Sequence, residues 1–235
     1  MESQTIIRTK LFPPVETAAL VPRSRLLDAL NARALRRLTL VAAPAGFGKT
    51  TLLGQWFRHL NSRMCCCWLS LDHEDASPQR FARHFIAALQ TVRPGIGRDA
   101  MQRLDNASLS DITEMLPEVV NQIAELEAPI AVFLDDFQFA GSEPVLQFVE
   151  LLLNLSADRF HLVLASRIRM SLPLAGLRVQ NQLTEITAAQ LRFDQEESSD
   201  FLTRIQGLDL TDNQLSSLLD HAEGWAAGLQ LASLS

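Results

Sequence analysis

The stretch APAGFGKTT at residues 43–51 decides the fold that this sequence predicts. Its end matches the phosphate-binding pattern G-x-x-x-x-G-K-[ST], although Ala43 stands where that pattern has its first glycine. An apolar run at 37–42 precedes the stretch, and residues 50–60 follow it with helical periodicity. We therefore expect a buried strand, a loop and a helix in that order. Because the first position mainly helps the chain to leave the strand, Ala43 with a proline after it weakens the match only modestly.

The residue types in this loop suit a bound phosphate. Backbone N–H groups at a helix N-terminus point at one spot and carry partial positive charge. Gly46 and Gly48 permit close approach of the backbone to a ligand. The Lys49 ammonium reaches β- and γ-phosphate oxygens, and the Thr50 hydroxyl is a ligand for Mg²⁺. The candidate nucleotide-binding residues of the loop are Ala45, Gly46, Phe47, Gly48, Lys49 and Thr50.

Two later apolar runs end in charged residues, and we expect both ends at the carboxyl edge of the same sheet. The run PIAVFLDDFQ at 129–138 ends its apolar part at Asp135 and Asp136. We expect Asp135 to bind Mg²⁺ through water and Asp136 to polarise an attacking water. The run RFHLVLASR at 159–167 ends in Arg167, whose guanidinium at this edge would contact a γ-phosphate. The alternative for the first run is that both aspartates are solvated in a turn. The alternative for the second run is that its arginine lies on the surface without a ligand.

Strand-like and helix-like segments alternate along most of the chain, as in parallel sheets covered on both faces. The expected strands lie at 37–42, 64–71, 129–136, 159–167 and 183–187, and the expected helices lie near 21–30, 50–60, 78–92, 108–127 and 143–155, with a loop at 93–99. This order predicts an α/β P-loop NTPase fold. Its parallel five-stranded sheet would have an additional strand between the P-loop strand and the acidic Walker B strand, with helices on both faces.

The character of the chain changes after about Asp194, where only helices are expected. We therefore divide the chain into a P-loop nucleotide-binding domain at 1–190 and the start of a small helical subdomain at 191–235. The last helix reaches Ser235 without a cap or a breaker. We expect the chain to be a piece of a longer protein.

Composition and charge exclude several functional classes. The 235 residues are 47% hydrophobic and 20% charged, as in an ordinary soluble domain. The formal net charge of −6 gives no overall attraction to nucleic acid or to an anionic membrane, so we expect neither as a direct partner. No apolar run is long enough to span a membrane and the N-terminus has no signal-peptide pattern, so we expect a cytoplasmic location.

Two short patterns have simple interpretations. Three consecutive cysteines at 65–67 lie in an apolar run, which suits a buried strand better than a zinc site or a disulfide. The HED sequence at 73–75 is expected to be a solvated turn, with contact to the outer shell of a metal as the alternative. The histidines elsewhere show no metal-ligand spacing.

Several longer motifs together resemble one family. LVPRSRLLDAL, VAAPAGFGKTTLLGQW, CWLSLDHED, VFLDDFQ, LVLASR and EGWAAGLQLA occur in the order found in the MalT-like large LuxR-type regulators, which belong to the STAND class of signal-transduction ATPases. The resemblance covers about residues 6–235. It implies a module that rests with ADP and that, with ATP and an inducer, self-associates and activates transcription, while hydrolysis resets it. The sensor and DNA-binding domains of such a regulator lie C-terminal to the part seen here.

The resemblance also assigns roles to particular loop and strand residues. Lys49, Thr50 and Thr51 match the phosphate and Mg²⁺ positions of the family. Asp135 and Asp136 match the acidic pair of the family, and Arg167 matches its γ-phosphate sensor. We expect ATP rather than GTP, because the family uses ATP and the chain contains no N-K-x-D guanine motif.

Three positions outside the loop are assigned by resemblance alone. Val21 and Arg23 match a short motif that borders the adenine, although VPR replaces its glycine-containing form in other STAND proteins. Trp225 matches a position placed against the nucleotide, with packing in a core as the alternative. Gln138 stands where several relatives have histidine after the acidic pair, so the role of that position is open.

The function expected from these observations is an ATP-binding, slowly hydrolysing switch module of a transcriptional activator. One alternative is a nucleotide-locked scaffold or oligomerisation module without turnover. The other is a P-loop phosphotransferase, which needs an acceptor pocket and a second Arg/Lys lid that the sequence does not supply convincingly.

Overall fold

The structure is a computed structural model that describes residues 5–15, 20–31, 36–104, 109–156 and 158–234. Its centre is a five-stranded sheet with the strand order β2-β3-β4-β1-β5, and every pair of neighbours is parallel. The strands are β1 (Leu38–Ala42), β2 (Cys65–Ser70), β3 (Ile130–Asp135), β4 (Phe160–Ser166) and β5 (Leu183–Thr187). The predicted additional strand is confirmed: β4 lies between β1, which precedes the glycine loop, and β3, which ends at the acidic pair.

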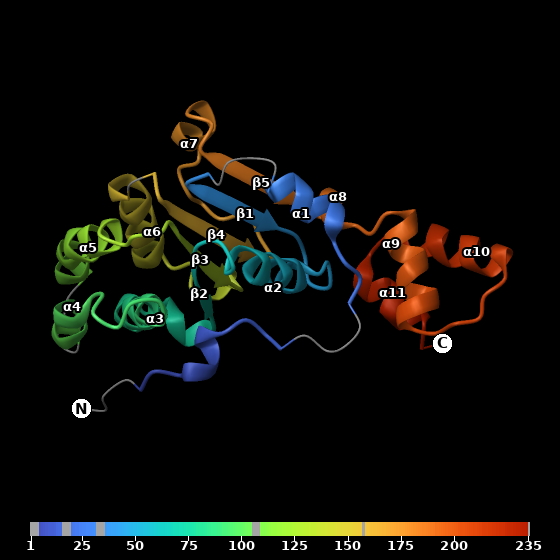
Figure 1. Ribbon diagram of the computed structural model, residues 1–235, viewed down its shortest axis with the longest axis horizontal. Helices are drawn as coiled ribbons and strands as arrows, with labels where there is room; N and C mark the ends of the chain where they lie inside the picture. Colours follow the sequence, from blue (N-terminus) through green and yellow to red (C-terminus); the bar gives the residue numbers. More distant parts are fainter. Residues whose placement is uncertain (1–4, 16–19, 32–35, 105–108, 157, 235) are drawn as a thin grey trace.

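Helices cover both faces of this sheet (Figure 1). The α-helices before the end of β5 are α1 (Ser24–Asn31), α2 (Lys49–Leu60), α3 (Pro78–Gln90), α4 (Arg98–Arg103), α5 (Leu109–Ala124), α6 (Glu143–Leu155) and α7 (Ala175–Val179). Short 3-10 turns occur at η1 (Arg8–Leu11), η2 (His73–Ala76) and η4 (Phe137–Phe139).

Alternation along the strands divides the core into two layers. In β3, Val132 and Leu134 pack with apolar residues of α3, α5 and α6. Ala131 and Phe133, which point to the opposite face, pack with residues of α1 and α2. Because β3 is buried on both faces, all of its residues are apolar until the chain leaves the sheet at Asp135.

After β5 every regular element of the described residues is a helix or a helical turn. The elements are α8 (Ala188–Leu191), α9 (Gln195–Asp200), the π-helical turn η5 (Phe201–Ile205), α10 (Asp212–Ala222) and α11 (Ala226–Ala232). In Figure 1, α9, α10 and α11 form a separate group at one end of the molecule. Glu223 and Gly224, both with positive φ, separate α10 from α11. The division of the chain at residue 190 stays a prediction.

The region between α3 and α5 differs from the expected loop. A short helix, α4, begins directly after Gly97, which has a φ of +62°. The Gly97 N–H donates to the Gln122 side chain at 2.6 Å, so α5 fixes the start of α4. The sequence pattern missed α4 because six residues are too few to show a helical period.

The turn expected to be solvated around residues 73–75 is buried at its last residue. Asp75 is fully buried, and Lys10 Nζ lies 2.6 Å from its Oδ2 while His84 Nδ1 lies 2.9 Å from its Oδ1. Burial alone would raise the pKa of Asp75, but the hydrogen bonds from His84 and Lys10 hold it well below its usual range. The expected solvated turn is therefore wrong for Asp75, which ties η1 to the end of β2 and to α3.

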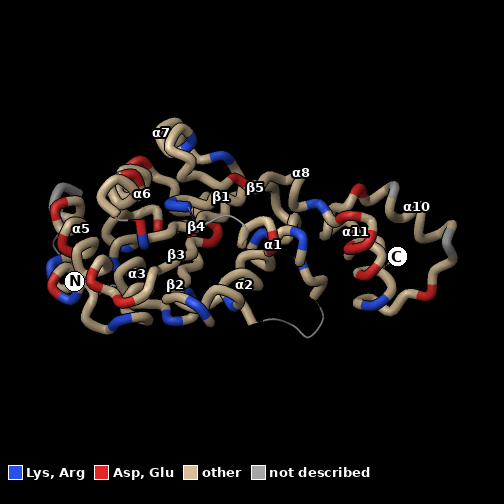
Figure 2. Tube along the Cα trace, turned by 45° about the horizontal axis from the view of Figure 1, so that its top comes forward, with Lys and Arg blue, Asp and Glu red and all other residues tan. Residues whose placement is uncertain are grey.

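The expected interpretation of the cysteines is confirmed, since all three lie in β2 and two of them are buried. Burial raises the pKa of Cys66 to about 12. Lys/Arg and Asp/Glu positions are interspersed along the trace in Figure 2, without a single basic stripe in the described part of the chain. Among the described helices, none is long and apolar enough to cross a membrane.

Candidate functional site

The glycine loop joins β1 to α2 at the carboxyl edge of the sheet. Gly46 and Gly48 have φ values of +80° and +75°, a conformation that favours glycine at both positions. Lys49, the first residue of α2, is buried, and its Nζ donates to the carbonyls of Ala43 at 2.8 Å and of Pro44 at 2.9 Å. Burial lowers the pKa of Lys49, an effect that the nearby carboxylate of Asp136 opposes. The loop therefore surrounds a cationic group with backbone.

Asp135 ends β3 beside this loop with an unsatisfied oxygen. The residue is 3% exposed, and its Oδ1 has no hydrogen-bond partner within the described residues. Burial raises the pKa of Asp135 to about 6, although a hydrogen bond with the Thr50 side chain acts in the opposite direction. A buried carboxylate oxygen without a partner is costly, and a hydrated cation would satisfy it.

This buried carboxylate predicts a pH-dependent gain in stability for Asp135→Asn. The folded state raises the pKa from 3.8 to about 6, so it holds a proton more tightly than the unfolded chain does. Stability of the unmodified, ligand-free chain should therefore fall as pH rises from about 4 to about 6, and the loss should persist above that. The variant should be more stable than the unmodified chain above pH 6 by on the order of 2–3 kcal/mol, with no gain at pH 4.

Urea unfolding of the ligand-free proteins between pH 4 and pH 8 measures this difference. Asp209→Asn serves as the matched control, because Asp209 is exposed and its substitution should leave the curve unchanged. A constant difference between Asp135→Asn and the unmodified chain across this range would contradict the expected ionisation.

The next residue, Asp136, faces the end of β4. It has a φ of +54°, and its Oδ1 lies 3.6 Å from the Nε of Arg167, directly after β4. The side chain of Gln138 lies between these two residues and contacts both. Both Asp136 and Arg167 are partly exposed at the carboxyl edge, so their charged groups remain accessible.

The upstream residue Arg23 contacts the helical segment that follows β5. Arg23 is 2% exposed, its Nε lies 3.1 Å from Glu197 Oε1, and its Nη2 donates to the Leu191 carbonyl at 2.8 Å. Its guanidinium also lies 4.6 Å from the centre of the Phe193 ring. Burial lowers the pKa of Arg23, and Glu197 counteracts this. The structure thus places Arg23 in a buried ion pair that holds the start of α9.

Trp225 lies beside the glycine loop, and its side chain is 38% exposed. Its ring centroid is 6.5 Å from that of Phe47. Two residues further on, the backbone N–H of Ala227 donates to the Gly46 carbonyl at 3.1 Å. The start of α11 therefore packs directly against the glycine loop. A tryptophan packed in a core, the alternative given above, would not predict this contact.

A cavity of about 280 Å³ opens between the loop and the helical segment that follows β5. Its lining includes Val21, Arg23, Gly48, Thr51, Phe201 and Gln230. An apolar cavity beside a phosphate-binding loop suits a flat heterocycle, with phosphates extending towards the loop. Thr51 and Val21, which the sequence placed near a nucleotide, both line it.

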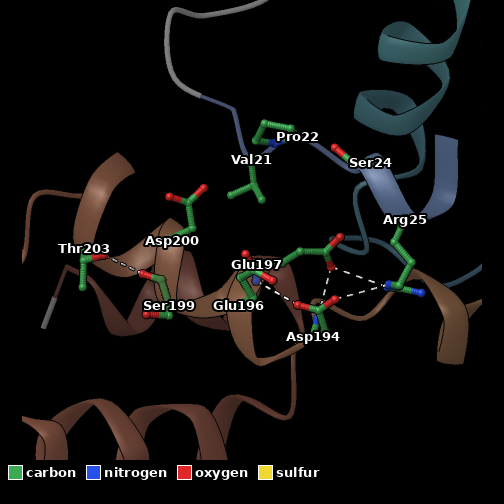
Figure 3. Close-up of a pocket in the computed structure, with 10 residues that line it drawn as sticks. All are labelled: Val21, Pro22, Ser24, Arg25, Asp194, Glu196, Glu197, Ser199, Asp200 and Thr203. Carbon is green, nitrogen blue, oxygen red and sulfur yellow. Dashed lines mark hydrogen bonds and ion pairs between the residues drawn. The ribbon is translucent and has the colours of Figure 1, made fainter. Parts of the chain in front are cut away.

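A larger hollow, of about 580 Å³, also has Val21 in its lining (Figure 3). Its lining carries four carboxylates, Asp194, Glu196, Glu197 and Asp200, and one arginine, Arg25. Arg25 is already paired with Asp194 at 3.3 Å and with Glu197 at 3.5 Å. Because these carboxylates would repel phosphates, the smaller cavity beside the loop is the better nucleotide site.

Comparison with known proteins agrees with this geometry. Residues 20–165 match the model of the AAA ATPase domain family, so the chain belongs to that family. The serine/threonine-protein kinase PknK of Mycobacterium tuberculosis is 35% identical over 97% of this chain and 20% of its own length. The HTH-type transcriptional regulator MalT of Yersinia enterocolitica is 32% identical over 98% of this chain and 25% of its own length.

Solved structures show the same fold. A STAND protein with a tetratricopeptide repeat sensor from Pyrococcus horikoshii superposes with a TM-score of 0.67 at 18% identity, over 95% of this chain and 31% of that one. AMPPCP-bound DnaA from Aquifex aeolicus gives 0.50 at 15% identity, over 91% of this chain and 61% of that one. Together with the match to the AAA ATPase domain family, these findings identify a P-loop NTPase module, which is similar to a part of MalT and of PknK. The chain spans only a fifth to a quarter of the length of these two curated relatives, PknK and MalT.

Proposed function

We propose that this chain binds ATP and ADP at the glycine loop and hydrolyses ATP slowly as the switch module of a larger regulator. The observation that carries the proposal is that the buried Oδ1 of Asp135 has no hydrogen-bond partner within the described residues. The same carboxyl group has a hydrogen bond with the Thr50 side chain, and Asp136 is the next residue. The glycine loop, the Asp135 carboxylate and Arg167 all lie at one edge of the sheet. That combination suits phosphoryl transfer from a nucleotide.

The residues present fit Mg²⁺. Asp135 and Thr50 already contact each other, and both carry oxygen atoms, the ligands that Mg²⁺ requires. Thr50 would bind the ion directly and Asp135 would hold it through water. When bound with the nucleotide, Mg²⁺ neutralises charge that develops on the β- and γ-phosphates.

The protein's own groups then have distinct roles. Lys49 would exchange its contacts with the loop carbonyls for phosphate oxygens, since an ammonium binds phosphate more strongly than a carbonyl. Asp136 would orient and polarise the attacking water. Arg167, with its partly exposed guanidinium, would contact the γ-phosphate and so distinguish ATP from ADP.

A switch fits the comparisons better than a dedicated enzyme. The matching relatives are named as a protein kinase and as a transcriptional regulator, so one module serves proteins with different outputs. We propose an ADP-bound resting form and an ATP-bound form that self-associates in response to an inducer. Sensor and DNA-binding parts outside this chain would detect the inducer and act on transcription.

The first test is to denature the purified chain, identify any released nucleotide, and titrate Mg²⁺ with ADP or ATP against the emptied protein. Co-purified ADP that binds more tightly than ATP would support a resting switch. Tight binding of either nucleotide without any turnover would support a nucleotide-locked scaffold instead. Weak binding of both would contradict the proposed function.

Asp136→Asn is expected to lower ATP turnover by about a hundredfold with little effect on ADP affinity, because the amide cannot polarise water as the carboxylate does. Steady-state phosphate release and ADP titration measure the two effects separately. Asp158→Asn is the matched control, since that carboxylate is 91% exposed and far from the loop in sequence and fold. Turnover equal to that of the unmodified chain would remove Asp136 from the reaction.

A further inference from the structure

The side chain of Gln138 spans the gap between the ends of β3 and β4. Its Nε2 donates to Asp136 Oδ1 at 2.8 Å. Its Oε1 accepts a hydrogen bond from the backbone N–H of Arg167 at 2.9 Å. One amide therefore links the Asp136 carboxylate, directly after β3, to the first residue after β4, although 29 residues separate Gln138 from Arg167.

These two bonds require a side chain that is both donor and acceptor. Asp136 accepts only, as a carboxylate, and the Arg167 N–H donates only, so a single orientation of the Gln138 amide satisfies both. A glutamate would bring a second negative charge to Asp136, and an apolar side chain would satisfy neither group. The chemistry of the contact explains why an amide of this length stands at residue 138.

The two residues that this link joins have further constraints on their geometry. Asp136 has a left-handed backbone, with a φ of +54°, which a residue other than glycine adopts at a cost. The guanidinium of Arg167 lies 5.5 Å from the centre of the Phe139 ring, and that ring lies 4.2 Å from the imidazole of His73. Phe139 thus gives Arg167 a surface to pack on, while Gln138 holds its backbone.

We propose that Gln138 is a positioning residue that holds Asp136 and Arg167 in register across the end of the sheet. This inference rests on the proposed function, in which Asp136 polarises water and Arg167 detects the γ-phosphate. Gln138 does not contact the nucleotide in this scheme. It keeps the separation of the two groups small enough for both to act on one γ-phosphate, and changes in that separation are costly to rate.

The test uses Gln138→Met, which keeps length and volume but removes both hydrogen bonds. We expect ATP turnover to fall by about tenfold or more while ADP affinity stays within about twofold. The preference for AMPPCP over ADP, measured by equilibrium titration with Mg²⁺, should fall at the same time because Arg167 is less well placed. Gln102→Met, at an exposed position of α4, is the matched control and should change none of these values.

A combined variant separates positioning from a merely structural role. If Gln138 acts through Asp136 and Arg167, adding Gln138→Met to the double variant Asp136→Asn with Arg167→Ala should slow turnover no further. Three results would each overturn the inference. One is that the losses of turnover in the combined variant multiply, and another is that Gln138→Met leaves turnover and nucleotide preference unchanged. The third is that Gln138→Met lowers ADP affinity as much as turnover and also lowers thermal stability. If the unmodified chain binds nucleotide without turnover, the AMPPCP preference still decides the matter. Failure of the unmodified chain to bind any nucleotide would instead contradict the proposed function.

Discussion

Lys49→Ala should lose nucleotide binding, with an affinity for ATP and ADP at least about a hundredfold below that of the unmodified chain. Each charge-assisted hydrogen bond from the ammonium to a phosphate contributes about 1.5–3 kcal/mol, and two such bonds account for this factor. Lys49 is the buried cation of the loop, and its Nζ already lies within hydrogen-bonding distance of two loop carbonyls. Isothermal titration with Mg²⁺ and each nucleotide measures the loss.

A matched control separates this local effect from the loss of one positive charge. Arg63 is exposed, three residues beyond the end of α2, and Arg63→Ala changes the net charge equally. It should bind nucleotide as the unmodified chain does. Burial lowers the pKa of Lys49, so its charge is held at a cost in the ligand-free chain, and its removal should change thermal stability little. Unchanged affinity in Lys49→Ala would contradict the assignment of the loop.

The parts of the site that could be predicted from the sequence depend on residues that are close together in the chain. Apolar runs of five to seven residues became strands because each is buried in a parallel sheet. Since carboxyl ends of parallel strands share one edge, the positions of Asp135 and Arg167 followed from the ends of their runs. The glycine pattern needed only the conformations that Gly46 and Gly48 adopt.

Contacts between distant segments could not be predicted in this way. Glu197 lies 174 residues from its partner Arg23, and no periodicity or motif connects the two. The burial of Asp75 depends on Lys10 arriving from the N-terminal segment, so a charged turn was the natural interpretation of the local pattern. Gln138 was recognised only as a departure from relatives, because the backbone N–H that it binds belongs to a residue 29 positions away, directly after β4. Each of these contacts is a product of tertiary packing.

The contact between α11 and the loop leads to the second large expected effect, on Gly46→Ala. A Cβ at residue 46 would lie 2.6 Å from the Ala227 Cβ and 2.9 Å from the Trp225 Nε1, and its φ of +80° is itself unfavourable for alanine. The backbone conformation alone costs about 1–2 kcal/mol, and α11 must move to relieve the overlap. We expect loss of the hydrogen bond from Ala227 to the Gly46 carbonyl, lower stability and at least about tenfold weaker nucleotide binding.

Fluorescence reports the movement of α11 directly, because Trp56 and Trp68 are fully buried whereas Trp225 is 38% exposed. Emission of Gly46→Ala should shift to longer wavelength as Trp225 leaves the loop, and urea unfolding should begin at lower concentration. Gly176→Ala is the matched control, since a Cβ there would meet no atom within 4 Å. Adding Ala227→Gly removes the shorter of the two overlaps and should restore part of the fluorescence but not the full affinity, because the strained backbone at residue 46 remains. Full recovery of affinity would mean that helix packing alone, and not the conformation of the loop, limits nucleotide binding.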